Sequence, residues 1–243
     1  MDAIYYKIRD NNAVVCKAAY SVLGVTLEGQ KDILGIWVGE NESSKFWMGV
    51  LNDLKTRGAK DIYLCISLWY KDFGDGLKGF SEAISAIYPQ TQVQRCIVHQ
   101  IRASSKYVSY KHLKEFIRDL KTIYGSVNED QAMENFVIVK EKWGKLYPSA
   151  IRSWEDNWNN LVTFFNYPIE IRKVIYTTNA IEGLHRQFRK VTKTKQVFPH
   201  DDSLKKMLYM ASKNIMKKWT QRYKNWDIVL NQLMIMFPDR QSA

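Results

Sequence analysis

The sequence contains few cysteines and no long apolar run. Its three cysteines, Cys16, Cys65 and Cys96, are far apart in the chain, and two of them lie in apolar, strand-like runs. Cysteine in such runs behaves as a small hydrophobic residue, so we expect no disulfide framework and a reducing compartment. No apolar run approaches the roughly 18 residues that a membrane-spanning helix needs, so no membrane association is expected.

The chain also lacks a charged-then-apolar leader, an internal repeat and a low-complexity linker. The missing leader argues against secretion, so we expect a soluble, cytoplasmic protein. The missing linker and repeat leave one large domain or two small ones as the possible organisations. A chain of 243 residues is long enough to bury a core without disulfides or a structural metal.

Basic and apolar residues, in contrast, are plentiful. Hydrophobic residues make up 46% of the chain and aromatic residues 13%, which is typical of a packed globular protein. Lys and Arg number 36 against 25 Asp and Glu, a formal net charge of +11. This excess favours a polyanionic partner such as nucleic acid or an anionic membrane. The alternative is an ordinary basic protein whose extra lysines form a solvated face.

The apolar pattern predicts strands first and helices later. Residues 3–8, 13–23 and 32–38 are rich in β-formers and are separated by Asn-Asn and Glu-Gly turns, which indicates an antiparallel meander. A helix over 43–57 that ends at Gly58, a strand over 61–67, a helix over 77–87 and a strand over 92–98 follow. Residues 99–175 keep a helical period, and further helices are predicted over 179–193, 203–219 and 226–236.

This order predicts an α/β fold, a mixed sheet with flanking helices, that is interrupted by an all-helical insertion. We assign residues 1–98 to the first part of the α/β domain and residues 99–175 to the insertion. Residues 176–243 are then the C-terminal helices that complete the domain.

The predicted helix over 179–193 has two distinct faces. Its apolar stripe consists of Ile181, Leu184, Phe188 and Val191. A second stripe places one acid, Glu182, in line with three bases, Arg186, Arg189 and Lys193. One interpretation is a surface helix with a solvated basic face. The other is a metal-binding carboxylate whose basic neighbours bind a phosphate backbone.

The resemblance of several segments to a known protein family favours the second interpretation. The segment YTTNAIEGLHRQFRKVTK closely resembles the catalytic-glutamate helix of bacterial mutator-type insertion-sequence transposases. Further segments resemble the same family in order along nearly the whole chain: DAIYYKIRD, GIWVGENESSKFW, DGLKGFSEAI, YPQTQVQRCIVHQIR, KWGKLYPSAIRSW and NWDIVLNQLMIMFPDR. Their compatible spacing makes the resemblance specific.

The resemblance implies a ribonuclease-H-like fold that carries a DDE triad of carboxylates. Matched residue by residue, the triad is Asp2, Asp75 and Glu182. The family further implies that these side chains hold Mg²⁺ or Mn²⁺ for phosphodiester chemistry, in which two metal ions stand about 4 Å apart. Water would free a 3′-hydroxyl at the element end, and that hydroxyl would attack the target DNA.

The implied partners are DNA, as element ends and target, and further copies of the chain in a homodimer or higher oligomer. The implied location is the bacterial cytosol, at the nucleoid. Residues that we expect to contact DNA are Lys78, Arg95, His99, Arg102, Arg186, Arg189, Lys190 and Lys193.

Three smaller motifs leave alternatives open. Cys96 and His99 have the spacing of half a zinc site without a second pair, so we expect no zinc, and either a phosphate contact or simple packing. Trp154 and Trp158 are four residues apart, which favours core packing over a base-stacking platform. The glycines around Asp75 do not form a phosphate loop, which argues against an ATP site. His112, His185 and His200 are assigned no chemistry.

Two departures from the family bear on activity. The chain opens one residue before Asp2, so we expect it to lack the family's N-terminal DNA-binding region, and Asp2 would lie at a chain end. About six extra residues precede Asp75, which leaves Asp72 as a competitor for its place. An inactive remnant that only binds DNA or dimerises is therefore the competing hypothesis. A ribonuclease-H-type nuclease acting on hybrids is a third, which the helical insertion disfavours.

Overall fold

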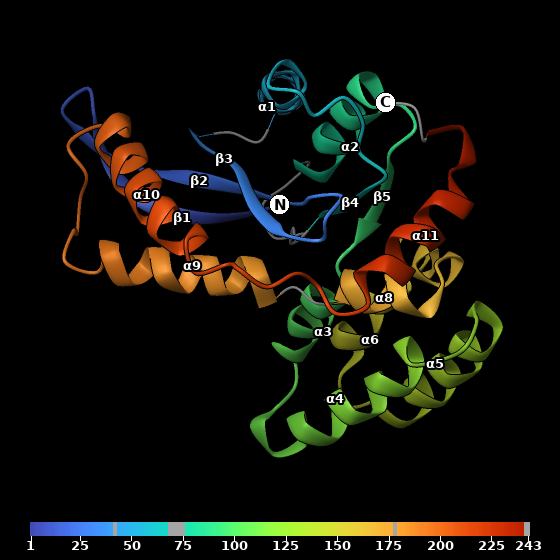
Figure 1. Cartoon of the computed structure of the whole chain (residues 1–243). Helices are drawn as coiled ribbons and strands as arrows, with labels where there is room; N and C mark the ends of the chain where they lie inside the picture. Colours follow the sequence, from blue (N-terminus) through green and yellow to red (C-terminus); the bar gives the residue numbers. More distant parts are fainter. Residues whose placement is uncertain (41–42, 68–75, 177–178, 241–243) are drawn as a thin grey trace. The chain divides into compact units, whose positions relative to one another are not determined.

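The computed structural model describes residues 1–40, 43–67, 76–176 and 179–240, except for the side chains of 67, 76–78 and 179 (Figure 1). The chain divides into two compact units. Unit 1 comprises Met1–Cys65, Phe73–Val93 and Thr177–Ala243, and unit 2 consists mainly of Gln94–Tyr176. The fold is mixed α/β, as predicted. The three-part division at residues 98 and 175 stays a prediction.

Unit 1 is built on an antiparallel meander of three strands, β1 (Asp2–Asp10), β2 (Ala13–Val25) and β3 (Lys31–Gly39), in the order β1-β2-β3. The first hairpin turns at Asn11 and Asn12, whose φ values of 44° and 65° are positive. Asparagine tolerates this conformation, and two such residues form the tight turn that matches strand twist. The predicted meander is therefore confirmed.

One face of this meander packs against two helices from the end of the chain, α9 (Asn179–Thr192) and α10 (Asp201–Met216). Alternate side chains of a strand point to the same face, and Ile4, Tyr6 and Ile8 of β1 are all buried. They form a core with Leu184 and Phe188 of α9 and with residues of α10. Helices distant in sequence from the first strand thus cover it.

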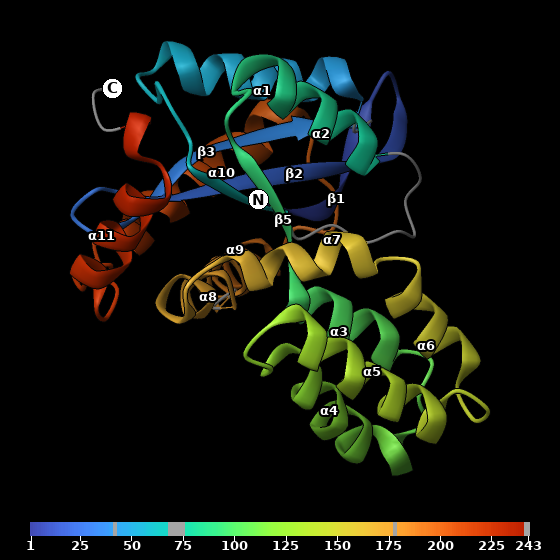
Figure 2. The same ribbon diagram turned by 90° about the vertical axis from the view of Figure 1, so that its right-hand side faces the viewer.

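The opposite face is covered by α1 (Ser44–Thr56) and α2 (Gly76–Ile87), which lie along one side of the strands in Figure 2. Tyr20 of β2 makes an edge contact with Trp47 of α1 at 5.2 Å between ring centroids. Trp47 in turn contacts Phe80 of α2 at 5.1 Å. Aromatic pairs at these separations favour such edge-to-face geometry. The meander is therefore the middle layer of unit 1.

The α1 boundaries agree with the predicted helix. Ser43 caps the first turn by accepting a hydrogen bond from the backbone N–H of Phe46, and Gly58 follows the last turn with φ 103°. A residue without Cβ adopts this left-handed conformation at little cost. Unit 1 also contains α11 (Trp226–Met236), which matches its prediction, and a short 3₁₀ helix at Pro238–Arg240.

Two short strands, β4 (Leu64–Ser67) and β5 (Gln92–Arg95), pair with each other. The predicted strand over 92–98 was wrong in its last part, because Ile97 already begins α3. Ile97 and Ile101 are both buried at helical spacing, and a short apolar run cannot by itself distinguish a strand from a buried helix.

Unit 2 is helical throughout its described residues from Ile97, as predicted. Its helices are α3 (Ile97–Ser105), α4 (Tyr110–Tyr124), α5 (Glu129–Trp143), α6 (Pro148–Glu155), α7 (Trp158–Val162), the 3₁₀ helix Thr163–Asn166 and α8 (Ile169–Tyr176). Trp154 and Trp158 belong to successive helices and are both buried, so core packing is confirmed. Among the described helices of the chain, none is long and apolar enough to cross a membrane.

A buried lysine connects the strands of unit 1 to α10. The ammonium group of Lys17 lies 2.7 Å from Asp10, 3.1 Å from Glu40 and 3.2 Å from Asp201, and its side chain is 9% exposed. The hydrogen bond from Lys17 holds the pKa of the Asp10 carboxyl below its usual range. Removing the Lys17 ammonium group is costly, because it leaves three carboxylates close together without a cation between them.

Replacing this lysine is expected to destabilise the protein near neutral pH. Lys17→Met should lower Tm by about 5 °C at pH 7, because three carboxylates lose their shared cation. A lowered folded-state pKa means that the stabilisation is present above the unfolded pKa of about 4 and is lost as pH falls below it. The Tm difference from wild type should thus shrink toward pH 3 in calorimetry. Lys205→Met, at an exposed pair with Asp202, is the matched control; an equal Tm drop there would contradict the prediction.

Candidate active site

The helix that carries Glu182 is positioned by its apolar face. Ile181, Leu184 and Phe188 are buried, with exposures of 5%, 0% and 1%, as the predicted stripe requires. The prediction was wrong at Val191, which is 44% exposed. Thr192 is buried in its place, and its hydroxyl donates to the Phe188 carbonyl. Residues spaced seven apart, such as Leu184 and Val191, are offset by about 20° around a straight helix. This offset moves Val191 away from the buried face.

Asp2 is the first residue of β1 and lies on the face of the meander that α9 covers. It is paired in register with Ser21 of β2 and shares its face with Ile4, Tyr6 and Ile8. One carboxylate oxygen, Oδ1, accepts a hydrogen bond from the backbone N–H of Ala3 at 2.9 Å. The start of the first strand is thus directed at α9.

The second oxygen of Asp2 contacts α9 itself. Asp2 Oδ2 lies 3.1 Å from Nδ1 of His185, whose side chain is 4% exposed. His185 is three residues after Glu182, and residues three apart on a helix are neighbours on one face. Glu182 is half-buried. The structure therefore brings Asp2 to α9, at a residue one helical turn from Glu182.

Two buried polar atoms near Asp2 have no hydrogen-bond partner among the described residues. They are the hydroxyl of Ser21, directly across from Asp2 in register, and Nε2 of His185. Buried polar groups of a protein are normally satisfied, so two unpaired ones beside Asp2 mark this part of the core as unusual. The carboxylates of Asp2 and Glu182 are hard oxygen donors, the kind that Mg²⁺ and Mn²⁺ prefer.

The third expected carboxylate, Asp75, lies outside the described residues, as does Asp72, and the side chain of Lys78 is not described either. Within the described part of the chain, no three His, Cys, Asp or Glu side chains lie close enough together to hold a metal ion. Asp2 and Glu182 belong to that part of the chain, and Asp75 does not. The described residues thus include two of the three carboxylates expected to bind a divalent cation, Asp2 and Glu182.

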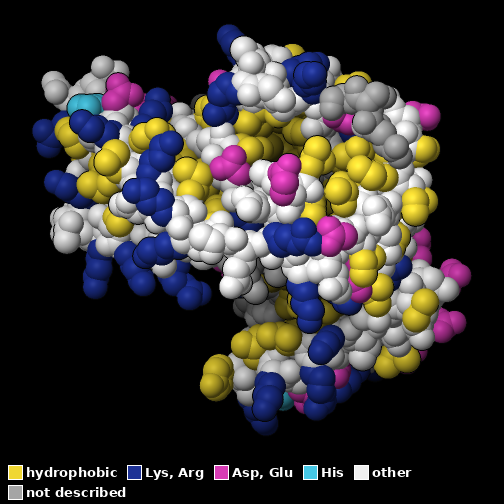
Figure 3. Space-filling view, in the orientation of Figure 1, with side chains coloured by type: hydrophobic (Ala, Val, Ile, Leu, Met, Phe, Trp, Pro, Cys, Tyr) yellow, Lys and Arg dark blue, Asp and Glu magenta, His cyan; other side chains and the backbone are white. Residues whose placement is uncertain are grey.

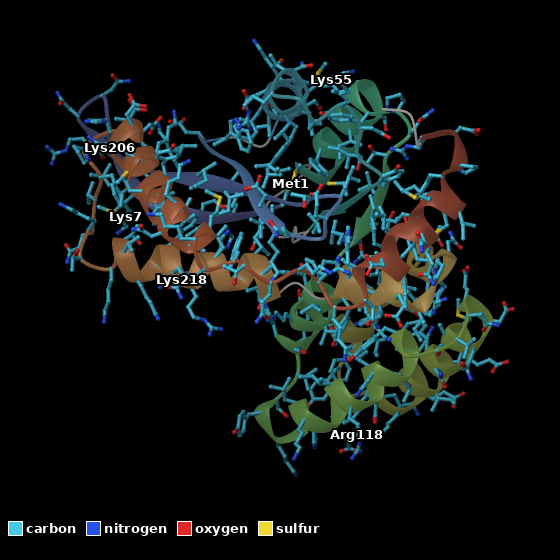
Figure 4. The ribbon with its side chains drawn as sticks, viewed as in Figure 1. Met1, Lys7, Lys55, Arg118, Lys206 and Lys218 are labelled. Atoms are coloured by element: carbon cyan, nitrogen blue, oxygen red, sulfur yellow. The ribbon has the colours of Figure 1, made fainter. Side chains whose placement is uncertain are left out.

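A basic surface extends from Glu182 along the outer side of α9. Arg186, Arg189, Lys190 and Lys193 are all exposed. Figure 3 shows Lys and Arg side chains gathered over α9 and α10, and Figure 4 places the labelled Lys7, Lys206 and Lys218 on the same part of unit 1. Cations aligned on one side of a helix form the electrostatic footprint expected for a phosphate backbone.

The remaining residues expected to contact DNA lie in unit 2. Arg95 is half-buried, its guanidinium donates to Asn157 Oδ1, and burial lowers its pKa. His99 Nδ1 lies 3.3 Å from the sulfur of Cys96 at the start of α3. Arg102 is exposed. The three are described within unit 2, and their role in DNA binding stays a prediction.

Sequence reasoning missed one residue of this site. His185 was assigned no chemistry, whereas the structure joins it to Asp2. The signal was present as Glu182-x-x-His185, a spacing that puts both side chains on one face of a helix, as in helix-bundle metal sites. The other two histidines have local partners: His112 bonds to Tyr147, and His200 caps α10 by accepting from the backbone N–H of Ser203.

Comparison with known proteins decides the family. The profile described as "Transposase, Mutator family" matches residues 1–222. The chain belongs to this family. It is 40% identical over 240 residues to the transposase for insertion sequence element ISRM3 of Rhizobium meliloti, an alignment that covers 98% of this chain and 58% of that protein. The chain thus spans about three fifths of the length of this relative.

Other insertion-sequence transposases are also similar to this chain. A probable insertion-sequence transposase of Corynebacterium diphtheriae is 36% identical over 260 residues, covering 99% of this chain and 74% of the relative. The IS256 transposase in Tn4001 of Staphylococcus aureus is 26% identical over 233 residues, covering 93% of this chain and 57% of the relative. The predicted membership in the mutator-type insertion-sequence transposases is therefore confirmed.

Proposed function

We propose that this Mutator-family chain catalyses metal-dependent DNA cleavage and strand transfer of an insertion sequence, with Asp2, Asp75 and Glu182 as its catalytic carboxylates. The observation that carries the proposal is the contact between Asp2 and His185, which brings the first strand to the helix of Glu182. Residues 183 positions apart in sequence, 185 − 2, meet there. Membership in the Mutator family of transposases supports the proposed reaction class.

The proposed chemistry needs charge compensation at an already anionic phosphodiester. Asp2 and Glu182 would hold Mg²⁺ or Mn²⁺ together with Asp75. When bound, such ions would stabilise the attacking and leaving oxygens of the displacement. Water attacks the phosphorus at the element end, and the P–O3′ bond breaks to free a 3′-hydroxyl. In the second step this hydroxyl attacks a target phosphodiester, and the P–O3′ bond of the target breaks as the new P–O bond forms, so the target strand leaves with its own 3′-hydroxyl.

We further propose that unit 1 has a ribonuclease-H-like arrangement and that unit 2 is the helical insertion. Three features of unit 1 support the first part: an antiparallel meander, an acid on its first strand and a late helix with a second acid against the same face. The compactness of Gln94–Tyr176 supports the second. An insertion that folds as its own unit can be long without disturbing the strands on either side.

DNA is the proposed partner, both as element ends and as target, and bringing two ends together favours a dimer or higher oligomer of the chain. The basic surface of α9 begins one turn from Glu182, so a backbone held there would run toward the carboxylates. Arg186, Arg189, Lys190 and Lys193 would neutralise successive phosphates and release their counterions.

Removing two of these cations is expected to weaken binding to all DNA sequences by a similar factor. For Arg189→Ala/Lys193→Ala, the slope of log K against log salt should become shallower by about 2, with roughly 10-fold weaker binding in 0.1 M salt. Fluorescence anisotropy with a labelled duplex measures both quantities. The matched control is Lys111→Ala/Lys114→Ala, two exposed lysines of α4. An unchanged slope in the α9 variant would show that DNA does not bind to this surface.

Activity itself is tested with supercoiled plasmid, which needs no knowledge of the element ends. The protein is stripped of metal with a chelator and then assayed with Mg²⁺, Mn²⁺ or Ca²⁺ for nicked and joined products. We expect nicking with Mg²⁺ and Mn²⁺. Plasmid binding without nicking under any of these metals would favour the competing hypothesis of a DNA-binding remnant.

A further inference from the structure

The carboxylate of Asp2 is held at both of its oxygens. Oδ1 accepts from the adjacent backbone N–H of Ala3 at 2.9 Å, and Oδ2 lies 3.1 Å from Nδ1 of His185. An ionised carboxylate can only accept, so Nδ1 carries the hydrogen in this contact. A hydrogen bond to a charged group is among the stronger ones in a protein. The imidazole therefore fixes the rotation of a side chain that stands at the first residue of its strand.

His185 is itself fixed by the core. Its ring is 3% exposed and stacks on Phe188 with an interplanar angle of 28° and 6.4 Å between centroids. Phe188 and Leu184 pack with Ile4 of β1, so the imidazole belongs to the part of α9 that packs against the first strand. Its Nε2 is buried and has no hydrogen-bond partner among the described residues. The contact with Asp2 is thus the polar anchor of the ring that the structure describes.

We propose that His185 is a positioning residue, which holds the Asp2 carboxylate in register with Glu182 so that the two can bind one divalent cation. This inference rests on the proposed function. His185 stands one helical turn from Glu182, so a bond from His185 to Asp2 sets the separation of the two carboxylates. The ring acts through Asp2, because its Nε2 is covered and not presented to a ligand. Neighbours that orient metal-binding side chains typically change metal affinity 10- to 100-fold.

Two substitutions separate positioning from packing. In His185→Asn the side-chain amide nitrogen takes the place of Nδ1 and can still donate to Asp2, whereas in His185→Gln the amide reaches the place of Nε2. Both variants are polar and smaller than histidine, so a loss of packing affects both. The readout is the Mn²⁺ dissociation constant of the intact protein without DNA, from electron paramagnetic resonance of free Mn²⁺, together with Tm without metal.

We expect His185→Gln to weaken Mn²⁺ binding by about 10- to 100-fold and His185→Asn by less than about threefold, at similar Tm. Equal weakening in both variants would overturn positioning and leave a packing role. Nitrogen couplings from the His185 ring in the Mn²⁺ spin-echo spectrum of the wild type would also overturn it, because the ring would then be a ligand.

The proposed function fails in a different way. If wild-type protein binds Mn²⁺ and Asp2→Asn and Glu182→Gln bind it equally well, the metal site lies elsewhere, and both proposals fall. If those two variants lose Mn²⁺ while His185→Gln keeps it, only the positioning role of His185 is wrong. A wild type that binds no Mn²⁺ removes the metal site and this inference with it.

Discussion

Glu182→Gln is expected to reduce metal-dependent plasmid nicking by at least about 100-fold while leaving the protein folded. Glutamine keeps the size of the side chain and removes the negative charge that a divalent cation needs. Glu182 lies in the first turn of α9, where a negative charge interacts favourably with the helix dipole. The stability cost should therefore be only about 0.5 kcal/mol.

The matching change on the first strand should have the same effect. Asp2→Asn removes the second carboxylate of the proposed site, and nicking should again fall by at least about 100-fold. The control is Glu134→Gln on α5, an exposed acid of unit 2. Gel analysis of nicked plasmid in Mg²⁺ and in Mn²⁺ is the measurement. Nicking that survives in Glu182→Gln at the wild-type rate would show that the carboxylate of α9 is not catalytic.

Arg240→Ala is expected to lower the free energy of unfolding by about 3 kcal/mol. Arg240 is 6% exposed at its side chain and forms a two-bonded ion pair with Asp61, through Nε at 2.7 Å and through a second guanidinium nitrogen. It also donates to the carbonyls of Gln90 and Ile62, each at 2.8 Å. Its guanidinium lies 4.8 Å from the ring centroid of Tyr63. Alanine would leave Asp61 and both carbonyls without this donor.

This pair also predicts a pH dependence. The hydrogen bond from Arg240 holds the pKa of the Asp61 carboxyl below its usual range. A depressed folded-state pKa gives stability that is present above the unfolded pKa of about 4 and is lost as pH falls through the folded value. Between pH 7 and pH 3 the wild type should therefore lose more stability than Arg240→Ala.

Urea unfolding of the two proteins at several pH values measures both effects. Arg240→Lys keeps the charge without the planar fork and should recover less than half of the loss. Arg222→Ala, at a pair whose side chains are 53% and 72% exposed, is the control and should cost less than about 1 kcal/mol. A loss of under 1 kcal/mol for Arg240→Ala would mean that the segment after α11 is not anchored by this residue.

Local chemistry explains which elements could be predicted. The Asn11-Asn12 turn and the end of α1 at Gly58 depend on a few adjacent residues, and the structure has both as expected. The helix α11 matches its predicted bounds for the same reason. Errors arose where a pattern was short or where position on a helix had to be judged by spacing alone. Ile97 starts a helix instead of ending a strand, and Val191 is exposed while Thr192 is buried.

Only part of the candidate site could be predicted from the sequence. The two faces of the helix over 179–193 and the resemblance of its segment identified Glu182 and the basic residues beside it. His185 was overlooked, because its spacing from Glu182 indicates a shared side of a helix and says nothing of Asp2, the distant carboxylate that it contacts. Asp2 Oδ2 and His185 Nδ1 lie 3.1 Å apart, a contact that no pattern of neighbouring residues predicts.

The sequence by itself determined the family, through its motifs, and the order of strands and helices and the basic face of α9, through periodicity along the chain. The three carboxylates that the resemblance implies stay a prediction. Only the tertiary structure decided which distant groups meet: Asp2 with His185, Lys17 with Asp201, and Asp61 with Arg240. Periodicity predicts which face of a helix or strand is buried. Which side chains of distant elements come into contact depends on how whole helices and strands pack. The contact of Asp2 with α9 follows from that packing.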